Sequence, residues 1–237
     1  MATFVLVHGG WVGGWFWRRV GNALRDAGHY VVAPTLTGCG ERKHLGTPET
    51  DLETHILDVV HAMEYEDVAR VVLAGHGYGG MVVTGALDRA SHRVYHAAYV
   101  DAFVPENGQS LADLRGAQAV EQYKQAAQAD GWRIPMPFKA ETMGITAEVD
   151  LRWMMHRFTP QPLRPFLTPL ALHSPEPPRV PRSFIRCKMN SPEWVPPMEA
   201  KARAAKMTMH EIDAPHYAPA THPKEIAALL MKMAPGV

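Results

Sequence analysis

The chain has 237 residues, 46% of them hydrophobic, and its 24 basic and 24 acidic side chains give a formal net charge of zero. This length fits one globular domain of the size common among α/β folds, and the balanced charge argues against an electrostatic search for nucleic acid or an anionic membrane surface. No apolar run approaches the roughly 18 residues that cross a bilayer, and the first residues lack the charged segment of a signal peptide, so we expect a cytoplasmic protein.

The first half of the chain alternates short apolar runs with amphipathic stretches, which is typical of βα units that build a parallel sheet. Thr50 and Glu53 have the spacing of a capping box, which predicts a helix start at this point. The expected strands cover residues 4–7, 30–33, 71–74 and 97–100, and the expected helices cover 15–27, 50–65 and 79–89.

From residue 105 to residue 181 the sequence becomes rich in proline, methionine and large aromatic side chains. We predict that this stretch is a helical cap inserted into a core formed by residues 1–104 and 182–237. The core resumes with expected strands at 183–187 and 207–212, a helix at "PMEAKARAAK" between them, and a last helix at 223–233. Cys39 and Cys187 lack metal-ligand spacing, so we expect two unpaired thiols and no metal site.

The stretch "LAGHGYGGMVV" runs from a strand through a glycine-rich turn into a helix, which is the sequence pattern of a nucleophile elbow. In a GxSxG elbow the middle position carries the attacking serine, and here that position is Gly77. The flanking side chains of His76 and Tyr78 project in other directions, so neither replaces the serine. The letters also match the dinucleotide fingerprint GxGxxG, but that fingerprint belongs early in a chain with an acid ending the second strand, so we disfavour it.

The stretch "HGGWVGGWFW" follows the first expected strand directly. A histidine–glycine turn at this place presents one backbone N–H to an oxyanion, and the residue after the nucleophile supplies another. The predicted donors are therefore the N–H groups of Gly10 and Tyr78, and the alternative is a tight turn without a chemical role. The candidate walls of an apolar substrate pocket are Trp11, His76, Trp132 and Trp153.

Near the end of the chain, "IDAPHYAPATHPKEI" places His216 in a loop between an expected strand and a proline-started helix. A general base lies at this place when the chain order of a triad is serine, acid, histidine. We therefore predict that His216 is the base and that His222 only precedes the last helix.

Together, "FVLVHGGWVGGWFWRRV", "VVAPTLTGCGERKHL", "LAGHGYGGMVV", "YVDAFVPENGQSL" and the His216 segment resemble the α/β-hydrolase family. The similar branch holds plant methylesterases, hydroxynitrile lyases and small bacterial ester or carbamate hydrolases, and the resemblance covers nearly the whole chain. It implies an α/β-hydrolase fold, with a mostly parallel twisted sheet flanked by helices and a helical cap. It also implies a Ser-acid-His triad, no cofactor, and small, often aromatic, esters or related carbonyl compounds as substrates.

The chain departs from the family pattern at two catalytic positions. Gly77 stands where the family has its serine, and Asn190 stands where the acid usually follows the strand that ends at Cys187. Asp101, at the end of the preceding strand, is a candidate replacement for the acid, although it could instead cap the loop "DAFVPENG". Glu193 is a weaker candidate.

Three functions are compatible with these residues. We favour a hydrolase of a small aromatic ester, carbamate or amide with a Ser-acid-His site, seen here without its nucleophile as a Ser-to-Gly form or a close natural variant, and thus in an inactivated form. If His216 holds a water molecule in the vacated space, it can still act as general base for direct attack of that water on the carbonyl. The first alternative is a natural cofactor-free lyase, decarboxylase or cyclase that uses His216 as general base, and the second is a non-catalytic small-molecule binding protein. In all three the partner is a small molecule, nucleic acid and membrane are not partners, and a homodimer is left open.

Overall fold

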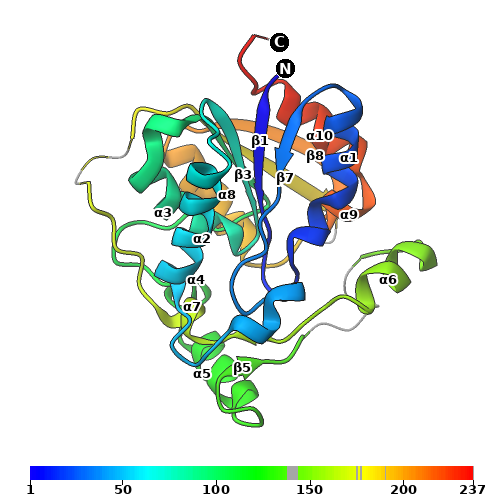
Figure 1. The fold of residues 1–237 in the computed structure, drawn as a ribbon. Helices are drawn as coiled ribbons and strands as arrows, with labels where there is room; N and C mark the ends of the chain where they lie inside the picture. Colours follow the sequence, from blue (N-terminus) through cyan, green and yellow to red (C-terminus); the bar gives the residue numbers. More distant parts are fainter. Residues whose placement is uncertain (138–143, 175, 177, 190, 237) are drawn as a thin grey trace.

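The computed structural model describes residues 1–137, 144–174, 176, 178–189 and 191–236. Within them, six strands form one parallel sheet in the order β2-β1-β3-β4-β7-β8 (Figure 1). The strands are β1 (Thr3–Val7), β2 (Tyr30–Val32), β3 (Val71–His76), β4 (Val94–Val100), β7 (Arg182–Met189) and β8 (Thr208–Pro215). This arrangement confirms the prediction of a mostly parallel sheet built from βα units.

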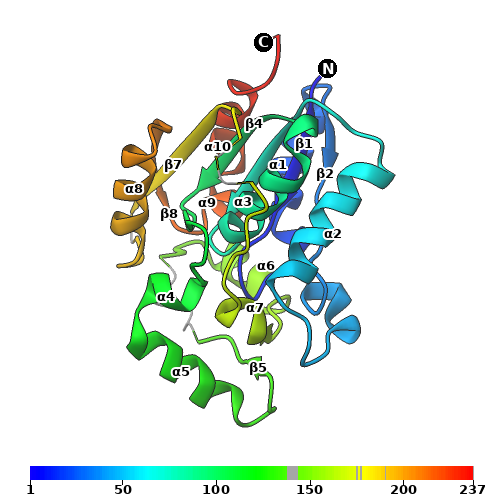
Figure 2. The same cartoon turned by 90° about the vertical axis from the view of Figure 1, so that its left-hand side faces the viewer.

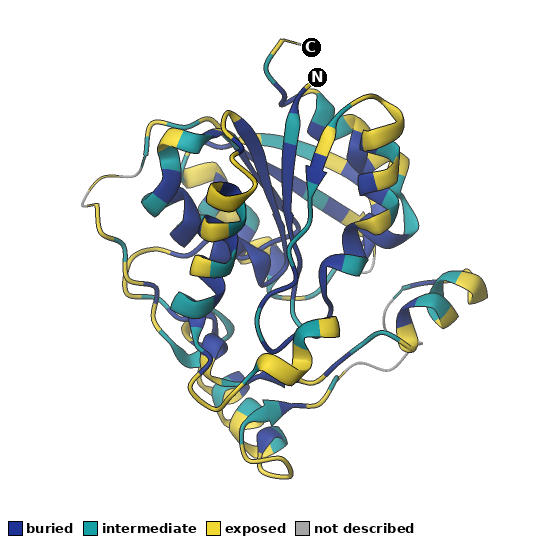
Figure 3. Ribbon diagram, in the orientation of Figure 1, coloured by how far each residue is buried: buried dark blue, intermediate teal, exposed yellow. Residues whose placement is uncertain are grey.

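The central strands bury both of their faces. Since successive side chains of a strand point to opposite sides, Val5 and Val7 of β1 join one apolar core while Phe4 and Leu6 join the other. Figure 3 shows these strands as the buried centre of the molecule. Burial on both faces explains why the strands read as continuous apolar runs in the sequence.

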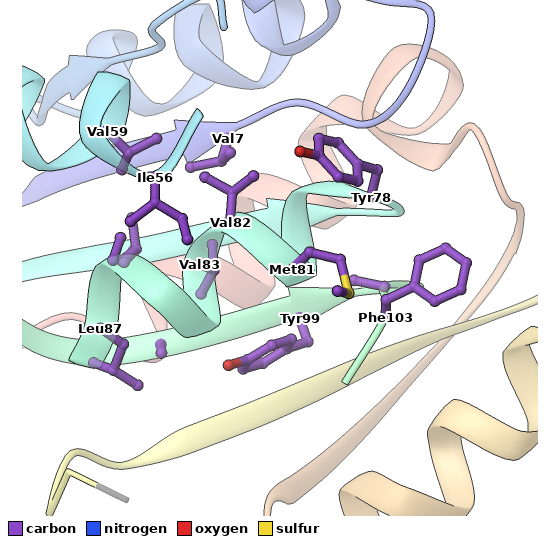
Figure 4. Packing of buried hydrophobic residues seen from close by; sticks show 14 of the residues in the cluster. Val7, Ile56, Val59, Tyr78, Met81, Val82, Val83, Leu87, Tyr99 and Phe103 are labelled. Atoms are coloured by element: carbon purple, nitrogen blue, oxygen red, sulfur yellow. The ribbon is translucent and has the colours of Figure 1, made fainter. Parts of the chain in front are cut away.

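Helices cover both faces of the sheet (Figure 1). One core includes residues of α2 (Leu52–Tyr65), α3 (Gly79–Ala90) and α8 (Val195–Ala204). The other core includes residues of α1 (Arg18–Asp26), α9 (Ala218–Thr221) and α10 (Pro223–Met231). Figure 4 shows the first core, where Val82 and Val83 of α3 lie near Ile56 and Val59 of α2.

Several element boundaries differ from the predictions. The helix expected at 15–27 begins as a 3₁₀ turn, η1 (Gly14–Trp17), and the short 3₁₀ segments η2 (Gly40–Leu45) and η3 (Ser91–Arg93) have no counterpart among the expected elements. The predicted position of the capping box of α2 is wrong by one residue. The box is formed by Asp51 and Thr54, where Asp51 Oδ1 accepts the Thr54 N–H at 2.9 Å. The predicted cap, Thr50, instead accepts the Thr47 N–H through its hydroxyl at 3.0 Å, so its side chain is engaged in the preceding turn.

The helices and short strands of segment 105–181 lie beyond the carboxyl ends of the parallel strands, and the described chain after residue 167 leads back to the start of β7 (Figures 1 and 2). The described part of the segment contains α4 (Leu111–Arg115), α5 (Ala117–Ala127), α6 (Glu148–Met155), α7 (Arg164–Leu167) and an antiparallel pair of β5 (Arg133–Ile134) and β6 (Gln161–Pro162). The division of the chain into a core and an inserted cap stays a prediction.

Cys39 and Cys187 are buried free thiols, as predicted. Burial raises the pKa of Cys39 to about 12, so this thiol is protonated at neutral pH. Among the described residues, no helix has both the length and the apolar character needed to cross a bilayer.

Candidate active site

Gly77 and Tyr78 form the sharp turn between β3 and α3. Gly77 has a φ of +53°, the left-handed region that costs residues with a Cβ about 1–2 kcal/mol. The start of α3 packs closely against the backbone after β4, because a Cβ at Gly80 would lie 2.1 Å from the carbonyl oxygen of Phe103. At Gly77, in contrast, an added Cβ would meet no atom closer than 3.6 Å, so the turn has room for a side chain there.

The free position at residue 77 faces His216. An ideal Cβ on Gly77 would lie 3.6 Å from His216 Nε2 and 3.8 Å from its Cε1. His216 lies in the loop after β8, and its Nδ1–H donates to Asp101 Oδ2 at 2.8 Å. Because this bond assigns the proton of the neutral ring to Nδ1, the lone pair on Nε2 points toward residue 77. An imidazole held in this way can act as a general base.

Asp101 follows β4 directly and is fully buried, with a φ of +44°. Its second carboxylate oxygen, Oδ1, accepts the Cys187 N–H at 3.0 Å and Arg186 Nη1 at 3.2 Å. These donors offset the cost of burying the charge. The side chain thus bonds to β7 and to the loop after β8, and not to the loop "DAFVPENG" that it was alternatively expected to cap. Glu193 is exposed, and Asn190 lies outside the described residues.

Gly10 and Tyr78 both line the space beside Gly77. In the described part of the chain, no backbone carbonyl accepts the N–H of either residue. The Tyr78 hydroxyl donates to His55 Nδ1 at 2.8 Å, and His55 Nε2–H donates to the Thr37 carbonyl at 2.8 Å. Burial lowers the pKa of His55 to about 4, so the ring is neutral at pH 7 and holds the Tyr78 side chain in place.

The turn after β1 is fixed by buried side chains. His8 Nδ1–H donates to the Gly9 carbonyl at 2.7 Å, and the Leu36 N–H donates to His8 Nε2 at 3.0 Å. Burial lowers the pKa of His8 to about 4, so His8 is a neutral structural residue at pH 7. Trp11 has a φ of +62°, and its backbone N–H donates to Gln161 Oε1 of β6 at 3.1 Å. The sequence reasoning missed Gln161, since a single glutamine in a proline-rich stretch carries no motif.

A cavity of about 800 Å³ opens at the elbow, between the carboxyl ends of the strands and segment 105–181. Of the four residues named as candidate pocket walls, Trp11 and His76 lie in the wall of this cavity. Trp132 and Trp153 do not lie in that wall. The Trp132 ring packs under the Arg133 guanidinium, and the Trp153 ring packs edge-on against Trp15 with centroids 5.2 Å apart.

Aromatic rings that the sequence reasoning did not single out form much of the cavity wall. Phe166 lies 5.5 Å from the ring of Trp11 and 5.1 Å from the ring of Tyr78, centroid to centroid. On another side, Trp194 stacks on Phe103 at 4.0 Å with an interplanar angle of 8°. Flat apolar walls of this kind suit an aromatic ligand.

His76 contacts His216 through a hydrogen bond and through its ring. Its Nε2–H donates to the His216 carbonyl at 2.9 Å, and the two rings lie 4.4 Å apart. Burial, together with the nearby His216, lowers the pKa of His76 well below its usual value. His76 is therefore a neutral wall residue. Within the described ranges, no group of three or more His, Cys, Asp or Glu side chains is arranged to hold a metal ion.

Known proteins are similar to this chain in sequence and in fold. The chain matches the alpha/beta hydrolase family over residues 4–229. It is 43% identical over 180 residues to the carbendazim hydrolyzing esterase of Nocardioides sp. (strain SG-4G), covering 73% of this chain and 74% of that protein. It is also 31% identical over 130 residues to salicylic acid-binding protein 2 of Nicotiana tabacum, covering 54% of this chain and 48%, about half, of the plant protein.

A solved structure extends the similarity to the whole chain. It is an extracellular alpha/beta-hydrolase from a Paenibacillus species, described as sharing structural and functional homology with tobacco Salicylic Acid Binding Protein 2. The TM-score is 0.87 at 25% sequence identity, and the match covers 99% of this chain and 100% of the other. The predicted fold class and the predicted resemblance are both confirmed, and the chain belongs to the alpha/beta hydrolase family, in which its relatives are named esterases and hydrolases.

Proposed function

We propose that this site is built to hydrolyse a small aromatic ester, carbamate or amide, and that Gly77 leaves it without the usual nucleophile. One observation carries the proposal: a side chain at residue 77 would begin 3.6 Å from His216 Nε2, whose ring is already bonded to Asp101. The 43% identical relative is named a carbendazim hydrolyzing esterase, which supports hydrolysis as the class of reaction.

Each residue of the site has a role in this proposal. Asp101 orients His216, and the N–H groups of Gly10 and Tyr78 stabilise the negative oxygen of the tetrahedral intermediate. In a serine form, His216 takes the hydroxyl proton of residue 77 as that oxygen attacks the carbonyl. In the Gly77 form, His216 takes a proton from water as the water oxygen bonds to the carbonyl carbon. The bond from that carbon to the leaving oxygen or nitrogen then breaks, and His216 gives the proton to the leaving alcohol or amine. Segment 105–181 acts as the cap that encloses the substrate.

The proposal is tested by Gly77→Ser, with Gly77→Ala as its matched control. Both variants pay the same backbone cost at a positive φ, but only serine adds a hydroxyl beside His216. We expect Gly77→Ser to hydrolyse p-nitrophenyl acetate and methyl aryl esters about 10³-fold faster than the Gly77 protein, with an acyl burst, and Gly77→Ala to show neither gain. Adding His216→Ala to the serine form should remove the gain. A folded serine variant without a burst on any of these esters contradicts the proposal.

The second candidate is a natural lyase, decarboxylase or cyclase that needs no cofactor. It is favoured by the same site, because the His216–Asp101 pair is complete while residue 77 offers no atom for an acyl-enzyme. His216 would then remove a proton from the substrate itself. This candidate predicts that His216→Ala abolishes the native reaction while Gly77→Ser leaves it unchanged or slower. A binding protein without chemistry would give no product with either residue changed.

A further inference from the structure

One cationic side chain lies in the cavity wall and has no role in the chemistry proposed above. Arg115, the last residue of α4, is the permanently charged side chain among the described residues of that wall, and no aspartate or glutamate lies among them. The remaining polar groups of the wall are neutral side chains and the two histidines. The cavity is thus apolar and aromatic, with a guanidinium on one side.

The Arg115 charge lacks a counter-ion inside the described part of the protein. None of the ion pairs between described residues includes Arg115, and its Nε atom is buried without a hydrogen-bond partner there. Arg115 and Tyr123 lie together in the cavity wall, where the Arg115 guanidinium is hydrogen-bonded to the Tyr123 side chain. Burial raises the pKa of Tyr123, and the charge of Arg115 and this hydrogen bond oppose that rise. A half-buried cation without an anionic partner is costly, and a bound anion would remove that cost.

A row of aromatic rings connects the elbow with Arg115. The Tyr78 ring lies 5.1 Å from Phe166, and the Phe166 ring lies 5.4 Å from Tyr123, which adjoins Arg115. All four side chains lie in the cavity wall. These rings line the wall of the cavity that also holds Gly77 and Arg115, so a substrate whose reacting carbonyl lies at Gly77 can extend past them toward Arg115.

We propose that the site takes an aromatic ester that carries a second, ionised carboxyl group, with the ester carbonyl at Gly77 and the carboxylate at Arg115. Guanidinium and carboxylate groups match in a planar, two-bond geometry, and such charge-assisted bonds are the strongest in proteins. The placement of the ester rests on the proposed function, whereas the placement of the carboxylate rests on Arg115 alone.

The test measures binding to the Gly77 protein by titration calorimetry at neutral pH. The anionic probe is the monomethyl ester of terephthalic acid, and the neutral probe is methyl 4-carbamoylbenzoate, which has nearly the same shape. We expect Arg115→Gln to weaken binding of the anionic ester by about 10- to 100-fold, as for loss of a hydrogen bond to a charged group, and to change binding of the neutral ester less than about 3-fold. Arg115→Lys keeps the charge but loses the planar guanidinium, so its affinity for the anionic ester should lie between that of the Gly77 protein and that of Arg115→Gln.

The matched control is Arg152→Gln, an arginine of α6 whose side chain is 67% exposed and pairs with Glu148. It should leave the affinity for both probes unchanged. An equal loss for both probes in Arg115→Gln would show that Arg115 only supports the wall, and an unchanged affinity for the anionic probe would likewise overturn the inference. Urea unfolding of Arg115→Gln and Arg115→Lys establishes that both variants are folded.

The same set of proteins separates this inference from the proposed function. If Gly77→Ser shows an acyl burst but Arg115→Gln does not discriminate between the probes, the hydrolase proposal stands and the inference fails. If Arg115→Gln discriminates between the probes and the serine form shows no burst, the carboxylate site stands and the hydrolase proposal fails.

Discussion

The Asp101 carboxylate divides its two oxygens between different partners. Oδ2 accepts His216 Nδ1–H, and Oδ1 accepts the Cys187 N–H and Arg186. The donors on Oδ1 fix which face of the carboxyl group meets the imidazole. Asp101 therefore determines both the orientation of His216 and the tautomer in which its Nε2 is a free base.

The amide replacement Asp101→Asn tests this role in the Gly77→Ser background. Because the Cys187 N–H and Arg186 demand an acceptor, the asparagine oxygen occupies the Oδ1 position and its NH₂ group faces His216 Nδ1. The imidazole must then carry its proton on Nε2, which no longer accepts the serine proton. We expect kcat to fall by about 10²- to 10⁴-fold with little change in KM, measured with a p-nitrophenyl ester. The exposed Glu193→Gln is the control, and a kcat for Asp101→Asn near that of its parent contradicts the assignment.

Residues set by local backbone motifs could be predicted from the sequence. Gly77, Gly10 and His216 each lie in a turn whose glycine or proline pattern marks it, and the structure brings all three to one cavity. Wall residues from segment 105–181 could not be predicted, because the direction of a side chain there depends on tertiary packing. Trp153 and Phe166 are both large aromatic residues of this segment, and no sequence pattern separates them, yet Phe166 lies in the cavity wall and Trp153 does not.

At the scale of elements, β6 supports the turn after β1. Gln161 of β6 is fully buried and accepts the Trp11 N–H, next to the proposed oxyanion donor Gly10. Phe166 closes on the same turn, since a Cβ on Gly10 would lie 3.1 Å from its ring. The long core strands were predictable from their apolar runs. The β5–β6 pair was not, because two-residue strands are too short to show a period.

Replacing Gln161 by methionine keeps the volume and removes the acceptor. In the Gly77→Ser background, Gln161→Met removes the hydrogen bond that the Trp11 N–H donates to Gln161 Oε1, at a cost of about 1–3 kcal/mol in the free energy of unfolding. We also expect kcat to fall by about 10-fold with a smaller change in KM, because the turn that carries the Gly10 N–H loses its support. Urea unfolding and steady-state kinetics measure the two effects. Gln128→Met, at an exposed site after α5, should change neither, and an unaltered unfolding free energy for Gln161→Met refutes the supporting role.

For the whole molecule, buried neutral histidines couple folding to pH. Burial lowers the pKa of His8 and of His55 from 6.5 to about 4, while both rings regain ordinary values on unfolding. The unfolded chain therefore binds more protons than the folded protein between about pH 6.5 and pH 4. Stability is at its full value above this window and is lost as the pH falls through it.

The variant His55→Gln tests the coupling. Glutamine can accept the Tyr78 hydroxyl and donate to the Thr37 carbonyl as His55 does, but it does not titrate. Between pH 7 and pH 5 we expect the native protein to lose about 2 kcal/mol more of its unfolding free energy than His55→Gln, as measured by urea denaturation. His156→Gln, at an exposed position after α6, should follow the native protein. If the native protein and His55→Gln lost equal amounts of unfolding free energy between pH 7 and pH 5, His55 would not contribute to the pH dependence of stability.

The bare Gly77 elbow changes how such a protein responds to covalent reagents. Fluorophosphonates and related organophosphorus compounds mark serine hydrolases by phosphorylating the hydroxyl oxygen at the tip of this turn. Here that oxygen is absent, although the imidazole that would activate it is in place. A proteomic survey that detects hydrolases by such labelling would pass over this chain, and its serine-restored variant would become visible.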